Sequence, residues 1–145
     1  MEITKVVTVV STGSGNKYFI DGVQQDTLEL KEGNTYTFDQ AAGSNSGHPL
    51  RFSTTSDGTH SSGTEYTTGV TTNGTPGSAG AYTQIVVADT TPHILYYQCS
   101  SHAHMGNRIG VNSQVLQGVS FVDTTGTAQT FASNAFAIAQ AVALG

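Results

Sequence analysis

Short segments in which apolar and polar residues alternate recur along most of the chain, and they constrain its fold more than any other feature. They are rich in β-branched and aromatic residues and are separated by turn signals such as Asp21-Gly22 and Glu32-Gly33-Asn34. A period of two is typical of strands, whereas an amphipathic helix needs a period of 3.6 residues. We expect strands over 3–10, 17–20, 27–30, 35–38, 49–53, 82–88 and 94–98, and one edge strand near 66–72 within long polar loops.

About seven short strands with such turns predict an all-β fold, an antiparallel Greek-key β-sandwich, with a closed barrel as the main alternative. Composition agrees, because only 10% of the residues are charged and Gly, Ser and Thr are abundant, which suits short strands joined by turns. A chain of 145 residues can bury one core without disulfides or metals. We assign residues 1–111 to the sandwich and 112–145 to a C-terminal extension, in which 120–130 could add a strand or two.

The chain's single cysteine, Cys99, directly follows the last of these strands, and the Ser-rich loop after it holds His102 and Met105. Thiolate, imidazole and thioether groups are the ligands that copper prefers, and a strand-to-loop turn can bring them to one point. His48, just before the strand-like segment 50–53, is the candidate for a second imidazole. A Cys-His-His zinc site is the alternative, since imidazole also suits zinc, but a thioether as the fourth group favours copper.

Each of these residues also has a purely structural interpretation. A lone cysteine is often a small buried hydrophobic residue, His48 can be a turn residue before Pro49, and Met105 can fill the core. The joint spacing of the four residues favours a metal role. We expect the other histidines to lie at the surface: His60, His93 and His104.

The pattern Cys-x2-His-x2-Met from Cys99 to Met105, with a distant upstream His48, resembles the cupredoxin, or blue copper, family. Residues 28–38 look like the family's strand, glycine turn and strand before the first histidine, and residues 96–111 are similar to its closing hairpin. The resemblance implies a cupredoxin-type sandwich that holds one copper ion, as Cu(I) or Cu(II).

The resemblance also implies a role for each ligand. Cys99 would supply a short thiolate bond, His48 and His102 would complete the plane, and Met105 would be the long axial ligand. His102, on the loop, would be the residue through which an electron enters or leaves the copper centre. Two features depart from the family pattern. Pro49 has no backbone N–H to donate to the thiolate. The ligand loop after Cys99 holds small and mostly polar residues, namely Ser100, Ser101 and Ala103.

A narrower resemblance concerns residues 48–60 and 65–70, which look like the cupredoxin-like domains of structural proteins of marine phages. It implies a place in a virion or another surface assembly. Residues 1–5 do not begin a basic region followed by an apolar one, as a signal peptide would. We therefore expect a virion component; the alternative is a periplasmic or extracellular protein whose leader is replaced by the start Met.

Several partner classes are disfavoured by charge and hydropathy. The net charge is -5 and the chain has only five Lys and Arg residues, without a basic cluster, so nucleic acid is not expected as a partner. No apolar run approaches the ~20 residues that a membrane-spanning helix needs.

The C-terminal segment 131–145 contains no charged residue and five bulky apolar ones. Its alanine content favours a helix, whereas the spacing of its larger residues favours a strand. In either form it would expose an apolar surface. We expect it to pack on its own domain or on a neighbouring subunit, which predicts a homo-oligomer or an array with other virion proteins.

Three classes of function therefore compete. The first is a copper-binding module of a virion or surface assembly, and the second is a free type 1 copper electron-transfer protein with a redox partner. The third is an enzyme with Cys99 as nucleophile and His102 or His104 as base. We do not expect an enzyme, because no third orienting group or oxyanion hole is evident.

Overall fold

The computed structural model describes residues 1–113, 117–122, 124–126 and 128–132. The chain divides into two compact units, Met1–Asn112 and Ser113–Gly145, which are described separately. The larger unit is built from strands and two short 3-10 helices, η1 (Gly43–Asn45) and η2 (Gly58–Ser61). The predicted all-β class is therefore confirmed.

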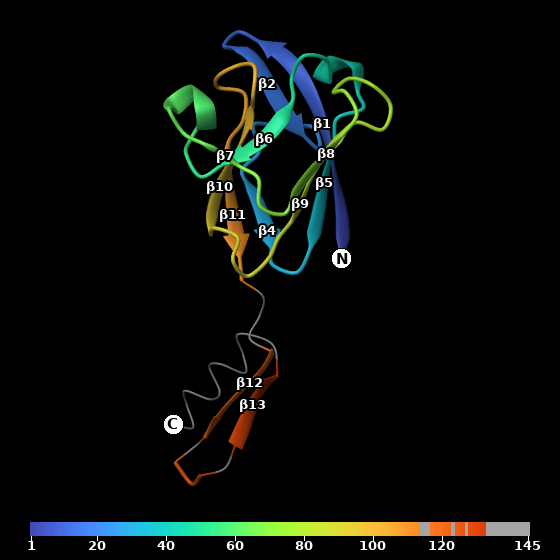
Figure 1. Ribbon diagram of the computed structural model, residues 1–145. Helices are drawn as coiled ribbons and strands as arrows, with labels where there is room; N and C mark the ends of the chain where they lie inside the picture. The colour runs from blue at the N-terminus through green and yellow to red at the C-terminus, as the bar shows by residue number, and fades with distance from the viewer. Residues whose placement is uncertain (114–116, 123, 127, 133–145) are drawn as a thin grey trace. The chain divides into compact units, whose positions relative to one another are not determined.

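Six strands form the first sheet of this unit, in the spatial order β3-β2-β1-β5-β9-β8 (Figure 1). Strand β1 has two partners, because residues from Glu2 to Val6 pair in parallel with β5 and residues from Val7 to Thr12 pair in antiparallel fashion with β2. The bounds are β1 Glu2–Thr12, β2 Gly15–Ile20, β3 Val23–Gln24, β5 Thr35–Asp39, β8 Val70–Asn73 and β9 Tyr82–Val86.

Five strands form the second sheet, in the order β4-β11-β10-β6-β7. Strands β4 and β11 run parallel, and the other neighbours are antiparallel. The bounds are β4 Leu28–Lys31, β6 Leu50–Ser53, β7 Glu65–Tyr66, β10 Ile94–Cys99 and β11 Arg108–Asn112.

Both sheets are mixed, in contrast to the expected antiparallel arrangement. The exceptions are the parallel pairs β1–β5 and β4–β11. Alternation in a sequence tells which face a side chain points to, but it carries no information on the direction of the neighbouring strand. The predicted sandwich therefore differs in how its strands are paired.

The edge strand expected near 66–72 is in fact two strands that belong to different sheets. Strand β7 pairs with β6, whereas β8 pairs with β9. The chain crosses between the sheets at Gly69, whose φ of 72° lies in the left-handed region that glycine adopts without strain. A Cβ there would lie 2.8 Å from the carbonyl oxygen of Val86, so this crossing also needs the close backbone approach that glycine permits.

One hydrophobic core lies between the two sheets. Phe38 on β5 and Phe52 on β6 meet edge to face with ring centroids 5.5 Å apart, and both are fully buried. Tyr18 on β2 and Tyr97 on β10 make a second contact across the sandwich, at 6.2 Å. The same core cluster contains Cys99 and Met105, so two predicted ligands lie in the closely packed interior of the unit.

The size of this core predicts that the domain folds without metal. Metal-free protein should unfold in one cooperative thermal transition followed by circular dichroism, unlike a zinc finger, whose core is too small. Saturating copper should raise the melting temperature, because a ligand that binds only the native state adds about 2.7 kcal/mol at 100 times its Kd. A metal-free protein without a cooperative transition would contradict the prediction.

The smaller unit contains the two-stranded antiparallel sheet of β12 (Gln117–Val122) and β13 (Ala128–Ala132), which agrees with the strands expected near 120–130. The question of helix or strand for 131–145 concerns residues that, from 133 onward, lie outside the described part. In the described part of the chain, no helix is long and apolar enough to span a membrane.

Candidate metal site

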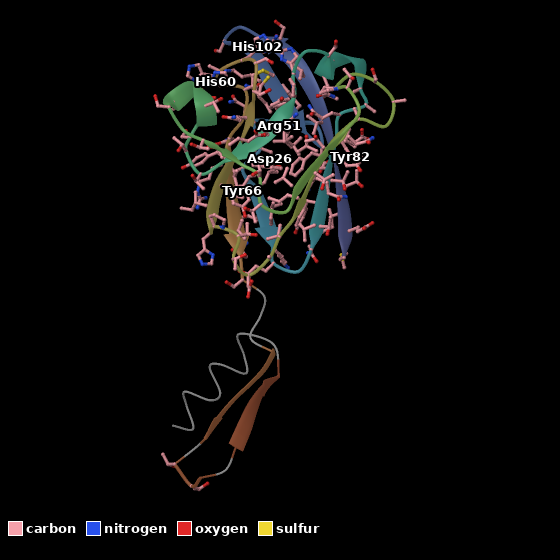
Figure 2. All side chains as sticks on the ribbon, viewed as in Figure 1. Asp26, Arg51, His60, Tyr66, Tyr82 and His102 are labelled. Carbon is pink, nitrogen blue, oxygen red and sulfur yellow. The ribbon has the colours of Figure 1, made fainter. Side chains whose placement is uncertain are left out.

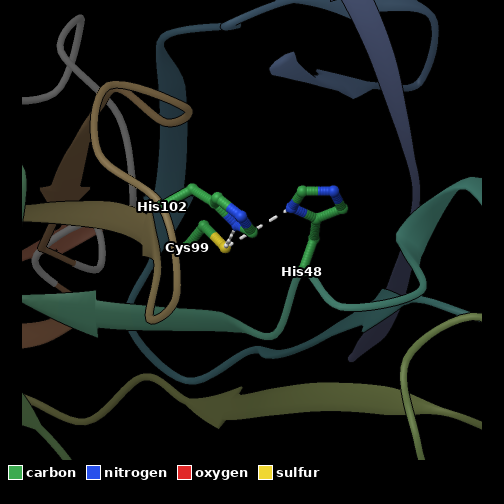
Figure 3. Close-up of side chains that lie close together, drawn as sticks. All are labelled: His48, Cys99 and His102. Atoms are coloured by element: carbon green, nitrogen blue, oxygen red, sulfur yellow. Dashed lines mark hydrogen bonds between the residues drawn. The ribbon is translucent and has the colours of Figure 1, made fainter. Parts of the chain in front are cut away.

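Strand pairing brings His48 and Cys99 together although they are 51 residues apart in the sequence. Cys99 is the last residue of β10, and it pairs with Leu50, the first residue of β6. His48 precedes Leu50 by two residues and lies beside the cysteine (Figure 3). His102 enters from the loop that follows β10, so two segments of distant sequence supply the cluster.

The three potential ligand atoms of His48, Cys99 and His102 all lie within 4.8 Å of one another. The Sγ atom of Cys99 is 3.7 Å from Nδ1 of His48 and 3.7 Å from Nδ1 of His102. With metal–sulfur and metal–nitrogen distances of about 2.3 and 2.0 Å, bond angles from tetrahedral to trigonal separate sulfur and nitrogen by about 3.5–3.7 Å. The group could therefore hold a metal ion.

Burial differs sharply among the three side chains. Cys99 is fully buried, His48 is 8% exposed, and His102 is exposed. The rings of His48 and His102 are 4.6 Å apart between centroids. Burial lowers the pKa of His48, and the neighbouring His102 lowers this pKa further. His48 thus favours the neutral form, which is the form that binds metal.

Met105, the fourth predicted ligand, is fully buried in the same core cluster as Cys99. Its carbonyl oxygen accepts a hydrogen bond from the backbone N–H of Tyr18, at 3.0 Å. This contact fixes the loop end that carries Met105. Because the side chain fills the core, its role as an axial ligand stays a prediction.

The segment from Asp57 to His60 holds the ligand loop near both of its ends. The Nε2–H of His60 donates to the carbonyl oxygen of Cys99 at 2.7 Å, and the backbone N–H of His104 donates to Oδ1 of Asp57 at 2.9 Å. His104 adopts a φ of 62°, which a non-glycine residue adopts only when its surroundings fix it. The Asp57 contact is part of that constraint.

The other side of the loop is held by β2 and by the turn after β3. Lys17 Nζ donates to the carbonyl oxygen of His104 at 2.6 Å, and Gln25 Nε2 donates to that of Gly106 at 2.9 Å. The backbone around the ligands is thus hydrogen-bonded on both sides. Such support holds the candidate ligand side chains in place.

A buried polar network around His48 has no counterpart in the sequence analysis. The side chain of Gln40 donates from Nε2 to the carbonyl oxygen of His48 at 2.8 Å and accepts from the N–H of Leu50 at 2.9 Å. The backbone carbonyl oxygen of Asn45 accepts a hydrogen bond from the backbone N–H of His48 at 2.8 Å. The side-chain Nδ2 of Asn45 donates to the carbonyl oxygen of Val7 at 2.7 Å. Isolated Gln and Asn residues near turns carry no signal that distinguishes such a network from solvent exposure.

The three histidines left out of the ligand set are all exposed, as expected. His104 is 81% exposed, with Nδ1 3.3 Å from Oδ2 of Asp57, and His93 Nδ1 lies 3.3 Å from the carbonyl oxygen of Val111. Figure 2 shows His60 and His102 at the same end of the sandwich. His60 contacts the backbone of Cys99 and does not join the ligand cluster.

Comparison of this chain with protein-family models, with curated proteins and with solved structures finds no match.

Proposed function

We propose that the larger unit is a copper-binding module of cupredoxin type, in which His48, Cys99, His102 and Met105 hold one ion. The observation that carries the proposal is the convergence of Nδ1, Sγ and Nδ1, with both sulfur–nitrogen distances at 3.7 Å. A thiolate with a thioether from the same loop favours copper over zinc. A sandwich of two sheets with these residues at one end supports the Greek-key cupredoxin architecture as part of the proposal.

Bound copper would supply a centre that takes up and releases single electrons. The chain's residues would hold it in a fixed frame: Cys99 from a central strand of the core, His48 as a neutral imidazole and His102 from the braced loop. Little rearrangement would then accompany a change of oxidation state. The full burial of Cys99 opposes its use as a nucleophile on external substrates, so we do not propose an enzyme.

The test is a titration of freshly purified metal-free protein with Cu(II), followed by metal analysis and visible spectroscopy. One equivalent of bound copper with an intense thiolate charge-transfer band is expected. A colourless protein after the titration would refute the copper assignment. Tight binding of one Zn(II) that Cu(II) cannot displace would assign the cluster to zinc instead.

Alanine substitutions of histidines should separate ligands from neighbours. His48→Ala and His102→Ala should each lose the copper band, because each removes one of the two imidazoles. The matched substitutions His93→Ala and His104→Ala should keep it, and so should His60→Ala, which removes only a contact to the backbone of Cys99. Loss of the band in His104→Ala would show that the wrong loop imidazole was chosen.

We propose that the module belongs to a virion or another surface assembly. The phage-like segments 48–60 and 65–70, the polar ligand loop and the uncharged segment 131–145 support this context. The alternative is a free electron carrier in the periplasm or outside the cell, which the exposed His102 favours because it gives a redox partner access to the centre.

Deleting Phe131–Gly145 should distinguish assembly from self-packing. If the segment joins subunits, the full-length protein sediments as an oligomer in analytical ultracentrifugation and the truncated one as a soluble monomer with an unchanged copper spectrum. If it covers its own domain, the full-length protein is a monomer and the truncated one aggregates or unfolds. A full-length monomer at high concentration would refute the assembly role and favour the free carrier.

A further inference from the structure

Tyr18 on β2 contacts two residues of the candidate site, His48 and Met105. Its hydroxyl donates to the carbonyl oxygen of His48 at 2.7 Å, and its backbone N–H donates to the carbonyl oxygen of Met105 at 3.0 Å. The side chain is fully buried. One residue of the first sheet is therefore hydrogen-bonded to the first and to the last of the four predicted ligands.

The hydroxyl of Tyr18 has one proton to donate, and the carbonyl oxygen of His48 accepts it. Because the tyrosine is fully buried, this hydrogen bond forms away from solvent, and its loss would leave a buried acceptor with one partner fewer.

The carbonyl of His48 accepts a second hydrogen bond, from Nε2 of Gln40 at 2.8 Å. Tyr18 and Gln40 together therefore use both lone pairs of this oxygen. Because Pro49 has no N–H, the peptide between His48 and Pro49 can be held only through this carbonyl.

We propose that Tyr18 is a positioning residue of the metal centre, whose hydroxyl holds His48 through the carbonyl of that histidine. The inference rests on the proposed metal site. It assigns to this hydroxyl control over the placement of the His48 ligand and thus over copper affinity, the visible band and the reduction potential.

The chain offers a matched control for this residue. Tyr97 is also a buried tyrosine, 1% exposed, its hydroxyl donates to a backbone carbonyl, that of Asp26, at the same distance of 2.7 Å, and its ring contacts that of Tyr18. Tyr18→Phe and Tyr97→Phe each delete one oxygen and one hydrogen bond, so their costs in stability should be similar. Only the first deletion lies at the site.

The experiment compares copper affinity, band position and reduction potential in the two variants. Tyr18→Phe should bind copper about 10- to 100-fold more weakly, the usual cost of losing a partner of a ligand, with a displaced band and an altered potential, whereas Tyr97→Phe should match the wild type. Equal affinities, bands and potentials in the two variants would overturn the proposal.

If Tyr18→Phe does not fold, wild-type protein labelled with fluorotyrosine takes its place in the experiment. The fluorine resonance of Tyr18, but not that of Tyr97, should then move on loading with Cu(I).

A measurement on metal-free protein separates failure of this inference from failure of the copper assignment. The ring resonances of His48 should shift in Tyr18→Phe and stay in place in Tyr97→Phe, because of the two tyrosines only Tyr18 donates to the carbonyl of His48. A wild-type protein without a copper band would refute the proposed function and leave this test intact. Unchanged His48 resonances in a folded Tyr18→Phe variant would refute the positioning role by itself.

Discussion

Replacing Cys99 with serine should abolish the intense visible absorption of the copper-loaded protein. The band requires charge transfer from a thiolate to Cu(II), and the serine hydroxyl is a harder group that stays protonated at neutral pH. Cys99 is the only cysteine in the chain, so no other thiol can replace it. We expect complete loss of the band in a Cu(II) titration, together with weaker copper binding.

The loss should not come from unfolding. A hydroxyl at this fully buried position costs about 1–3 kcal/mol, which a core that folds without metal should tolerate. Ser101→Ala, an exposed change in the same loop, is the control and should retain the wild-type spectrum. A colour that survives in a folded Cys99→Ser protein would remove Cys99 from the ligand set.

Replacing Gln40 with leucine should lower the free energy of unfolding of the metal-free protein by about 1–3 kcal/mol. The side chain is 1% exposed and bonds on both sides of Pro49, to the carbonyl of His48 and to the N–H of Leu50. Leucine has a similar volume and leaves no large cavity. The cost arises because the N–H of Leu50 is left without a partner in a dry core.

Urea denaturation of metal-free protein measures this effect. The control is Gln84→Leu, since Gln84 is only half-buried and bonds from Nε2 to the hydroxyl of Thr37 at 2.8 Å. This change should alter the free energy of unfolding by less than about 1 kcal/mol. Equal effects of the two substitutions would show that the Gln40 network does not contribute to stability.

The strands could be predicted because alternation is a local property of the sequence. The segments expected over 35–38, 82–88 and 94–98 correspond to β5, β9 and β10, with ends that differ by a few residues. Pairing could not be predicted in the same way. The direction of β1 beside β5, and the assignment of β7 and β8 to different sheets, depend on contacts between distant segments.

The candidate site could likewise be predicted only in part. Cys99, His102 and Met105 follow one another at three-residue intervals, which makes them visible in the sequence, and His48 could be added because it precedes a strand. The residues that hold them could not be recognised. Tyr18, Gln40 and His60 act through hydrogen bonds to backbone carbonyls, and any residue type has a carbonyl, so such contacts leave no pattern of paired residue types.

The parallel pairing of β4 with β11 determines when during synthesis the domain can be completed. Leu28 lies opposite Ile109 in that pair, and β11 also borders β10, the strand that ends at Cys99. A nascent chain therefore cannot close its second sheet until residues up to Asn112 have left the ribosome, and non-local pairing of this kind is slow to form. If the proposed site takes up metal, capture by the complete ligand set would follow translation of the domain, when the last strand has docked beside the first strand of its sheet.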